Sequence, residues 1–298
     1  MLKVISSFFS LFILFELSAS YAAPNAPSED VKNDSPPKIG NYIFPSSQQP
    51  GSFISFGENI LPENTAQAFL YSDAFFGSHM HLIDALPYGV YGITDNFSVL
   101  LGVPIAVDYK EDKSHSSGLS DMPLQFEYAF YNDENSHFAD QMTVVTGMTF
   151  PTGSATKEPS TGLGSVSFFI GPTFNRTYVD WFVFSSGGAN LVTSHKGRKE
   201  GNSYLYEAGL GRNICTTSSD WLLAWTVEAN GQYTEKSRFK GETDPDSGGN
   251  TIFITPSLFI SSNQVTLQFG IGLPAVQHLF GDQTKTRYFL ASNLSWLF

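Results

Sequence analysis

The sequence predicts an all-β fold, a transmembrane antiparallel up-and-down β-barrel of about twelve strands. Three observations lead to this prediction: a secretory signal at the N-terminus, bulky apolar residues at every second position over most of the chain, and a last strand that ends in Phe298. A period of two is the spacing of side chains on one face of a β-strand. In a membrane barrel, one face of each strand meets lipid and the other lines the lumen.

Residues 1–22 have the features of a cleavable signal peptide. Lys3 is followed by an apolar run over residues 8–17 and then by small residues up to Ala23. This run is too short to cross the roughly 30 Å hydrocarbon core as a helix, and Ser20-Tyr21-Ala22 has the small-x-small pattern that signal peptidase cuts. The only cysteine, Cys215, lies far from this point, so the sequence provides no thiol for a lipid anchor and no intramolecular disulfide.

Residues 23–60 are expected to form a flexible, Pro-rich segment in the periplasm. Six prolines stand among Ser, Asn, Asp and Lys between residues 24 and 50, and such a composition buries too little apolar surface to hold a fixed fold. The barrel is then predicted to occupy residues 61–298. The sequence leaves open whether this segment or a loop plugs the lumen.

The alternation of apolar and polar residues divides the barrel into twelve strands. The clearest run is Val265 to Leu273, where every second residue is bulky and the residues between are Thr, Gln or Gly. The predicted strands lie near residues 66–76, 82–93, 97–108, 121–131, 139–151, 163–174, 180–194, 202–213, 220–235, 250–261, 264–275 and 285–298. A soluble β-sandwich also has alternating strands, but the signal peptide and the terminal strand favour a membrane barrel.

The connections between these strands alternate in length. Short turns, such as residues 94–96 and 262–263, alternate with longer and more charged stretches, such as residues 109–120 and 237–249. Bacterial barrels have short periplasmic turns and longer outer loops. This pattern therefore predicts that both chain termini lie on the periplasmic side of the outer membrane.

The inward-facing positions of the predicted strands collect acidic and polar side chains. The formal net charge is −12, which argues against nucleic acid as a partner because phosphate contacts need clustered Lys and Arg. The candidate lumen-lining residues are Asp108, Glu127, Glu207, Glu228, Gln232, Gln268 and the cation Arg287. An acidic lining would favour cations or amine-bearing solutes. Alternatively, these side chains only fill a narrow barrel with hydrogen-bonded polar groups. Neither interpretation requires a catalytic role, a cofactor or a metal ion.

The last strand carries a terminal Phe with apolar residues on the same face. The residues on this face are Tyr288, Leu290, Leu294, Trp296 and Phe298, with Ser292 departing from the pattern. The arrangement resembles the terminal signal by which Gram-negative outer-membrane proteins are recognised by their assembly machinery. It implies that machinery as a partner of this chain.

Four segments also resemble one family. They are Leu86 to Phe97 (LPYGVYGITDNF), Gly102 to Pro104, Gly118 to Leu124 (GLSDMPL) and Phe150 to Gly153 (FPTG). They are similar to the MetA-pathway of phenol degradation family of Gram-negative outer-membrane β-barrel proteins. The resemblance implies an integral outer-membrane channel or transporter for a small solute, which the family name associates with hydrophobic or aromatic compounds, in contact with outer-membrane lipids and lipopolysaccharide.

Two other functions remain open at this stage. A lipid-modifying enzyme is suggested by His115 and Ser117, because outer-membrane lipid hydrolases resemble one another in having a His and a Ser two residues apart. A structural or host-contacting surface protein is the second alternative. His79 and His81 share a spacing that suits a metal, but no further His or Cys supports one. The loop cations Lys157, His195, Lys196, Arg198 and Lys199 could pair with lipopolysaccharide phosphates or simply face solvent.

Overall fold

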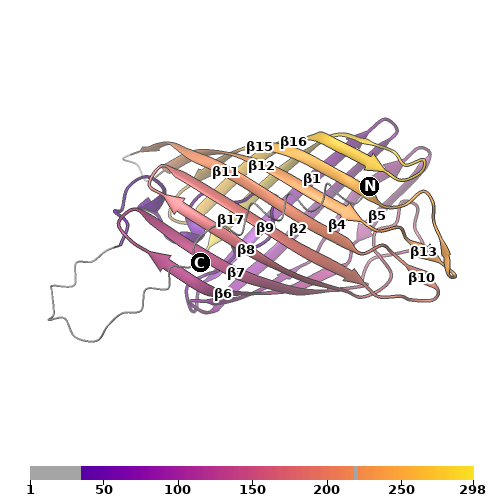
Figure 1. Cartoon of the computed structure of the whole chain (residues 1–298), viewed down its shortest axis with the longest axis horizontal. Coiled ribbons are helices and arrows are strands. Elements are labelled where there is room, and N and C mark those ends of the chain that lie inside the picture. Colours follow the sequence, from indigo (N-terminus) through magenta and orange to yellow (C-terminus); the bar gives the residue numbers. More distant parts are fainter. Residues whose placement is uncertain (1–34, 218–220) are drawn as a thin grey trace, which may run out of the picture. The chain divides into compact units, whose positions relative to one another are not determined.

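The computed structural model describes residues 35–217 and 221–298, which belong to one compact unit. Its wall is a single antiparallel sheet that closes on itself (Figure 1). The wall strands are β1 Ala66–Gly77, β2 Met80–Thr94, β3 Phe97–Gly102, β4 Ile105–Glu111, β5 Ser114–Leu119, β6 Met122–Glu134, β7 Phe138–Phe150, β8 Ser167–Tyr178, β9 Trp181–Val192, β11 Ser203–Thr217, β12 Trp221–Thr234, β15 Gly249–Ser261, β16 Val265–Leu279 and β17 Thr286–Leu297.

The wall contains twelve strands, as the sequence predicted. Both β3 and β4 pair with β2, so they are the two halves of one strand, which is broken at Val103-Pro104. Proline cannot donate a ladder hydrogen bond, and this accounts for the break. In the same way, β5 and β6 are two halves of the next strand. The barrel closes where β1 pairs with both β17 and β2, from Gln67 opposite Leu297 to Phe76 opposite Tyr288 on the β17 side.

The longer connections contain structure that the sequence did not reveal. Residues 109–120, expected as an outer loop, form a β-hairpin of β4 and β5 that turns at Asp112, whose φ of 52° is in the left-handed region. Two other long connections supply β10 Arg198–Lys199, β13 Arg238–Phe239 and β14 Glu242–Thr243, which pair in the order β10-β13-β14. Paired strands satisfy backbone polar groups even where the side chains are charged, so composition alone hides these elements.

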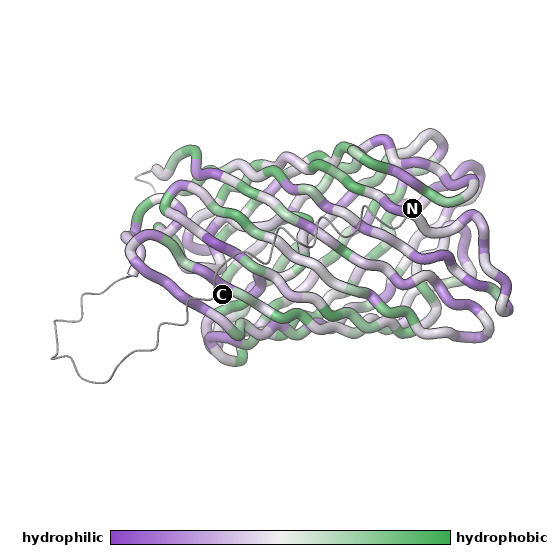
Figure 2. Tube along the Cα trace, viewed as in Figure 1, coloured by the Kyte–Doolittle hydropathy of each residue, from purple (hydrophilic) through white to green (hydrophobic). Residues whose placement is uncertain are grey.

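The outward face of the wall is apolar. Along β17, Leu290, Leu294 and Trp296 are 45–48% exposed, whereas Phe289 and Ser295, which have the opposite parity, are 2–3% exposed. Figure 2 shows hydrophobic residues along the strands, and the connections at the two ends of the barrel are mainly hydrophilic. An apolar outer belt on a closed sheet leaves no unpaired backbone to face lipid. No helix among the described residues is long and apolar enough to cross a bilayer.

The segment before β1 lies inside the barrel. It contains two short 3₁₀ turns, η2 Gly40–Ile43 and η3 Ser46–Gln48. Its hydrogen bonds reach the wall on different sides: Asn41 Nδ2 to the Tyr178 carbonyl (2.9 Å), Ser261 Oγ to the Gln48 carbonyl (2.7 Å) and the Leu61 amide to Ser98 Oγ (2.9 Å). Only a segment in the lumen can contact strands all around a closed wall. We call residues 40–61 the plug.

This observation corrects the prediction of a flexible segment over residues 23–60, which is wrong for residues 40–60. Tyr42, Phe44, Phe53 and Ile60 are each less than 10% exposed, so these side chains bury apolar surface that the overall composition of the segment conceals. Residues 23–34 and the predicted signal peptide over residues 1–22 lie outside the described part of the chain.

The plug enters and leaves at the end of the barrel that carries the short turns. Ser35 Oγ contacts Glu134, at the end of β6, at 3.3 Å. At the other end of the segment, the Phe298 amide donates to the Ala66 carbonyl at 2.8 Å. The chain therefore makes an excursion into the lumen and returns to the rim where the C-terminus also lies.

Candidate functional site

Glu228 is the main anchor of the plug. This residue lies on the inward face of β12 and is 0% exposed. Its carboxylate accepts hydrogen bonds from the backbone amides of Phe53, Ile54 (3.1 Å) and Ser55 (3.1 Å), and from Ser55 Oγ (3.1 Å). Successive amides that converge on one anion form a concave anion-binding arrangement. These bonds compensate the carboxylate for the water that it loses on burial.

Two further wall carboxylates hold the plug on other sides of the lumen. Glu127, on β6, accepts from the Asn59 amide at 2.9 Å and from Asn59 Nδ2 at 2.7 Å. Glu207, on β11, accepts from Ser186 Oγ at 2.7 Å and from the Phe56 amide at 3.3 Å. The plug is therefore attached to the wall at three points through carboxylate side chains.

A tight loop within the plug presents these amides. Gly57 and Glu58 have φ values of 92° and 68°, a backbone conformation that glycine adopts at least cost. Their turn brings Glu58 Oε2 to 2.8 Å from the Ser52 amide, and Ser52 Oγ to 3.1 Å from the Ser55 carbonyl. Burial raises the pKa of Glu58 from its usual value of 4.5 to about 7, with smaller contributions from the nearby Glu228 and Glu127.

Aromatic contacts supplement the hydrogen bonds. Phe44 packs in a buried cluster with Phe182, Phe184, Leu222, Ala224 and Phe259. Phe53 packs in a second cluster with Phe289 and Ala291, to which Tyr71, Phe75 and Phe253 add. Phe56 makes an edge-to-face contact with Phe169, with ring centroids 4.7 Å apart. The inward face therefore carries large aromatic side chains as well as the small and polar ones that the sequence pattern predicted.

Two glycines of the wall make room for the plug aromatics. A Cβ atom at Gly270 would lie 2.7 Å from the ring of Phe53, and one at Gly171 would lie 2.7 Å from the ring of Phe56. Both distances are shorter than any ordinary carbon–carbon contact. These glycines let the wall approach the plug closely.

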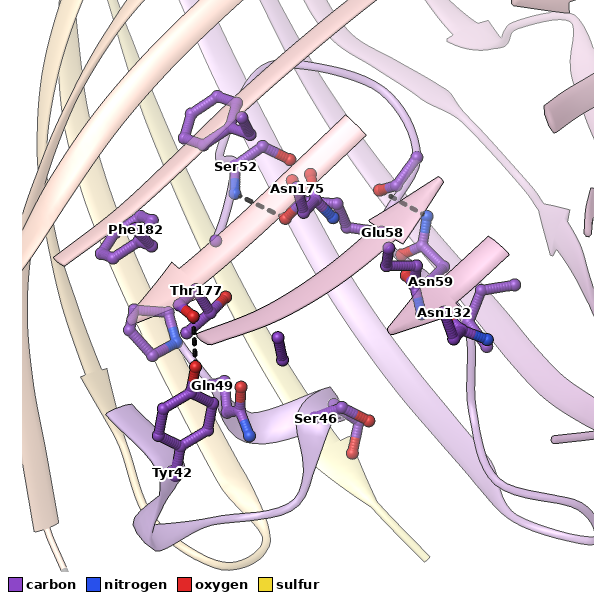
Figure 3. Close-up of a pocket in the computed structure, with 18 of the residues that line it drawn as sticks. Tyr42, Ser46, Gln49, Ser52, Glu58, Asn59, Asn132, Asn175, Thr177 and Phe182 are labelled. Atoms are coloured by element: carbon purple, nitrogen blue, oxygen red, sulfur yellow. Dashed lines mark hydrogen bonds between the residues drawn. The ribbon is translucent and has the colours of Figure 1, made fainter. Parts of the chain in front are cut away.

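A cavity of about 490 Å³ lies between the plug and the wall on the side of the short turns. Figure 3 shows Tyr42, Ser46, Gln49, Ser52, Glu58 and Asn59 of the plug around this space together with Asn132, Asn175, Thr177 and Phe182 of the wall. The Tyr42 hydroxyl donates to the Thr177 carbonyl. At the rim of this cavity, Arg176 and Asp140 form an ion pair at 2.6 Å. The lining thus combines aromatic surface with many hydrogen-bond acceptors.

The predicted lumen residues have different positions. Glu127, Glu207 and Glu228 face the plug, as described above. Gln268 is 2% exposed and its Nε2 lies 3.4 Å from Ser257 Oγ. Gln232 is exposed near the end of β12 that lies away from the short turns, and its Nε2 donates to Thr234 Oγ1 at 3.1 Å. Arg287 is exposed at the rim opposite the short turns, where it contacts Ser78 Oγ at 3.2 Å.

The assignment of Asp108 to the lumen is wrong. The β2–β4 register shifts by one residue, so Ala106 lies opposite Asp84 but Asp108 lies opposite Ile83. This bulge reverses the faces of the residues that follow it. Asp108 binds His81 at 2.9 Å and His115 at 2.7 Å. His81 lies opposite Phe76, which stacks on the exposed Tyr288, so this group is on the outer surface of the wall.

Two carboxylates that sequence reasoning missed face the lumen instead. Asp73 and Asp84 lie opposite each other on β1 and β2, and the Tyr109 hydroxyl donates to Asp84 at 2.6 Å. Asp73 shares its face with Tyr71, which contacts the plug residue Phe53 with a centroid distance of 6.1 Å. The alternation of Phe69, Tyr71, Asp73 and Phe75 along β1 is the sequence pattern from which the inward position of Asp73 could have been predicted.

The remaining candidates from the sequence are the His115 and Ser117 pair, a metal site and the terminal strand. In the described residues no hydrogen bond joins His115 to Ser117, and the His115 imidazole is bound to Asp108. No group of three or more His, Cys, Asp or Glu side chains in residues 35–217 and 221–298 is arranged to hold a metal ion. The terminal-strand residues Tyr288, Leu290, Leu294, Trp296 and Phe298 are all exposed on the outward face.

Comparison with solved structures shows the same fold in a known outer-membrane channel. The COG4313 outer membrane channel from Pseudomonas putida F1 superposes with a TM-score of 0.64 at 14% identity, covering 83% of this chain and 100% of that chain. LpxR from Salmonella typhimurium gives a TM-score of 0.47 at 8% identity, covering 78% of this chain and 100% of that chain. At such identities the likeness concerns the fold. A search of curated protein sequences gives no match.

A family model matches residues 47–287, which include the end of the plug and nearly the whole wall. This region is far more than half of the 298 residues. It also contains the four segments from which the resemblance was inferred. The chain therefore belongs to the family described as Putative MetA-pathway of phenol degradation.

Proposed function

We propose that this chain is an outer-membrane channel for small solutes, and that the structure represents its closed state. The observation that carries the proposal is the plug, which is bound to the wall by hydrogen bonds and side-chain packing. A barrel with an apolar outer belt and a polar interior is suited to passing solutes across a membrane. The description of the similar Pseudomonas putida structure as an outer membrane channel supports the same function.

The plug contacts support a role for the wall carboxylates that differs from ion selection. Glu127, Glu207 and Glu228 accept bonds from plug amides, so these side chains hold the plug. A hydrogen bond to a charged group contributes about 1.5–3 kcal/mol. Several such bonds are strong enough to close the lumen and weak enough to be broken without unfolding the wall.

The cavity beside the plug supports a solute class. Phe69, Phe182 and Phe259 provide aromatic surface, and Gln49, Asn59 and Asn175 provide hydrogen-bonding groups. A volume of about 490 Å³ is within the range of small-molecule sites. A small solute with an aromatic or apolar body and a few polar groups fits this lining. We place the short turns, the cavity and both chain termini on the periplasmic side, and the assembly machinery and outer-membrane lipids are the expected partners of the outward face.

The proposal is tested by single-channel conductance of the refolded protein in planar bilayers. A disulfide between plug and wall is introduced with Ser55→Cys and Asn230→Cys in a Cys215→Ser background, because Asn230 Nδ2 lies 3.3 Å from Ser55 Oγ. A second variant carries Glu127→Gln, Glu207→Gln and Glu228→Gln. Its matched control carries Glu111→Gln, Glu158→Gln and Glu242→Gln, three exposed carboxylates of the outer loops.

The expected results follow from the hydrogen bonds between the plug and the wall. The triple variant in the lumen should show larger and more frequent open steps than the wild type, while the matched control should behave like the wild type. The disulfide variant should pass no current until a reductant is added. A variant with residues 40–61 deleted that folds as a heat-modifiable barrel but conducts no ions would refute the channel function.

A further inference from the structure

The outer connections gather positive charge at one place in an acidic protein. Residues 195–201 and 235–243 contain six basic and three acidic residues, whereas the whole chain has a net charge of −12. The short sheet of β10, β13 and β14 brings the two segments together, with Arg198 opposite Phe239 and Lys199 opposite Arg238. The Lys240 amide adds a bond to the Gly197 carbonyl at 2.6 Å. The basic residues are therefore held in a paired structure.

A cavity of about 290 Å³ opens beside this sheet. Three cations line it, Lys199 from β10, Arg238 from β13 and Lys236 from the connection before β13. The other lining residues are Glu200, Gly201, Glu235 and Thr243. Lys236 and Arg238 are exposed and Lys199 is half-buried, so a ligand from outside can reach all three.

The two carboxylates of this cavity are already bound by other groups. Glu200 accepts from Arg198 Nε and from Ser237 Oγ, both at 2.6 Å. Glu235 accepts from Asn202 Nδ2 at 2.9 Å and from the Tyr204 hydroxyl at 3.1 Å. Each of these four oxygens thus already accepts one hydrogen bond, and Glu200 is also ion-paired with Arg198.

The three lining cations are left without an acidic partner. In the part of the chain that the structure describes, Lys199, Lys236 and Arg238 take part in no ion pair. Lys236 only approaches the ring of Phe280, at 5.1 Å from its centroid. A recess with three such cations is suited to an anion with several oxygens, and phosphate is an anion that both Arg and Lys bind.

The neighbouring tyrosines indicate the depth of the cavity relative to the membrane. Tyr204 and Tyr233 face outward at the ends of β11 and β12, with ring centroids 6.2 Å apart and exposures of 39% and 40%. Outward aromatics at a barrel rim lie at the boundary between lipid and water. The Tyr204 hydroxyl bonds directly to Glu235 of the cavity. The cavity therefore lies at the level of lipid headgroups.

We infer that the cavity lined by Lys199, Lys236 and Arg238 binds a phosphate group of a glycolipid in the outer leaflet, as lipid A carries. The inference rests on the proposed orientation of the barrel, in which the longer connections are on the outer side. Charge complementarity and the position at headgroup level both support a lipid-borne phosphate. The site would attach the β10-β13-β14 sheet to the membrane surface.

Lipid A binding to the refolded full-length protein in detergent tests the inference. The probes are bisphosphorylated lipid A, dephosphorylated lipid A and inorganic phosphate, and the readout is the bound fraction by native mass spectrometry. The site variant carries Lys199→Gln, Lys236→Gln and Arg238→Gln. Its control carries Lys110→Gln, Lys113→Gln and Lys285→Gln, which removes the same charge from other outer connections.

The site variant should bind bisphosphorylated lipid A at least tenfold more weakly than the wild type, and the control should change binding less than twofold. Dephosphorylated lipid A should bind as weakly to the wild type as to the site variant. Equal losses in both variants, equal binding of the dephosphorylated lipid, or saturation by inorganic phosphate alone with no preference for the lipid would overturn the inference. Conductance of the same variants is recorded separately: normal conductance with no lipid A binding refutes this site and leaves the channel function intact.

Discussion

At the scale of single residues, the function depends on what the lumen carboxylates bind. Glu228 is completely buried and faces three successive plug amides. Several amide donors stabilise a buried carboxylate, and removing these donors costs free energy because the carboxylate is then left without hydrogen-bond partners. Glu58 is different, because it lies within the plug and its carboxylate has one backbone donor, the Ser52 amide.

The raised pKa of Glu58 predicts that closure by the plug depends on pH. Burial raises this pKa to about 7 in the plugged state, and it returns toward 4.5 when the plug leaves the lumen. The plugged state therefore holds the proton more tightly. Its stabilisation by protonated Glu58 is complete below about pH 4.5 and is lost as the pH rises through 7. We expect open probability in planar bilayers to increase between pH 5 and pH 8.

Substitution of Glu58 checks this cause. The Glu58→Gln variant should show an open probability that changes little over the same pH range, whereas Glu63→Gln, at an exposed position beyond the plug, should keep the wild-type profile. Glu127, Glu207 and Glu228 face the same loop from β6, β11 and β12. If Glu58→Gln leaves the midpoint and the amplitude unchanged, the wall carboxylates control the pH response instead.

At the scale of elements, the plug and the wall are stabilised in different ways. The wall strands share continuous ladders of backbone hydrogen bonds, such as the thirteen paired positions between β12 and β15. The plug has two short 3₁₀ turns and is attached mainly through side chains. Segments with few ladder bonds open at lower free energy than the structure as a whole.

Hydrogen exchange should detect this difference. Amides of residues 40–61 are expected to exchange faster than those of β12 and β15 in the refolded protein. Phe44→Ala removes a ring from the cluster with Phe182, Leu222 and Phe259, a loss of about 3–5 kcal/mol for a buried Phe. It should speed plug exchange and leave exchange of the wall unchanged. The matched control is Phe239→Ala, at an exposed position in the β10-β13-β14 sheet. Equal protection of plug and wall amides against exchange in all variants would contradict a separately mobile plug.

At the scale of the whole molecule, the two ends of the barrel differ in their connections. The turns at one end are short, as between β2 and β3 or β15 and β16, and the connections at the other end contain the β4–β5 hairpin and the β10-β13-β14 sheet. The plug enters at the end with the short turns. The orientation in the membrane therefore decides from which side the plug can be released.

Labelling of intact cells with a membrane-impermeant thiol reagent tests the orientation. In a Cys215→Ser background, Lys240→Cys, in the turn between β13 and β14, should be labelled on intact cells. Asp95→Cys in the β2–β3 turn should be labelled only after the outer membrane is permeabilised. Both positions are exposed in the structure, so accessibility to the reagent depends on the side of the membrane. The opposite pattern would place the plug entrance on the cell surface.

The sequence by itself determined the barrel and left its contents undetermined. Strand number, short-turn positions and the outward residues of the last strand follow from a period of two, which is a local property of neighbouring residues. The plug depends on contacts between residues far apart, such as Ser55 and Glu228, and no local pattern records them. Tyr42-Ile43-Phe44 and Phe53-Ile54 are apolar groups of a kind that is unusual in a flexible segment. The prediction of flexibility came from the prolines and polar residues around them.

Only the tertiary structure decided the faces at irregular positions. One extra residue in β4 turned Asp108 outward, because a bulge reverses every side chain beyond it. Asp73 and Asp84 lie opposite each other in the regular pairing of β1 and β2. The structure likewise showed that Glu127, Glu207 and Glu228 bind plug amides, whereas their sequence positions predicted only that they face inward. Periodicity fixes which residues share a face of a strand, and the closing of the sheet around its own N-terminal segment fixes what that face contacts.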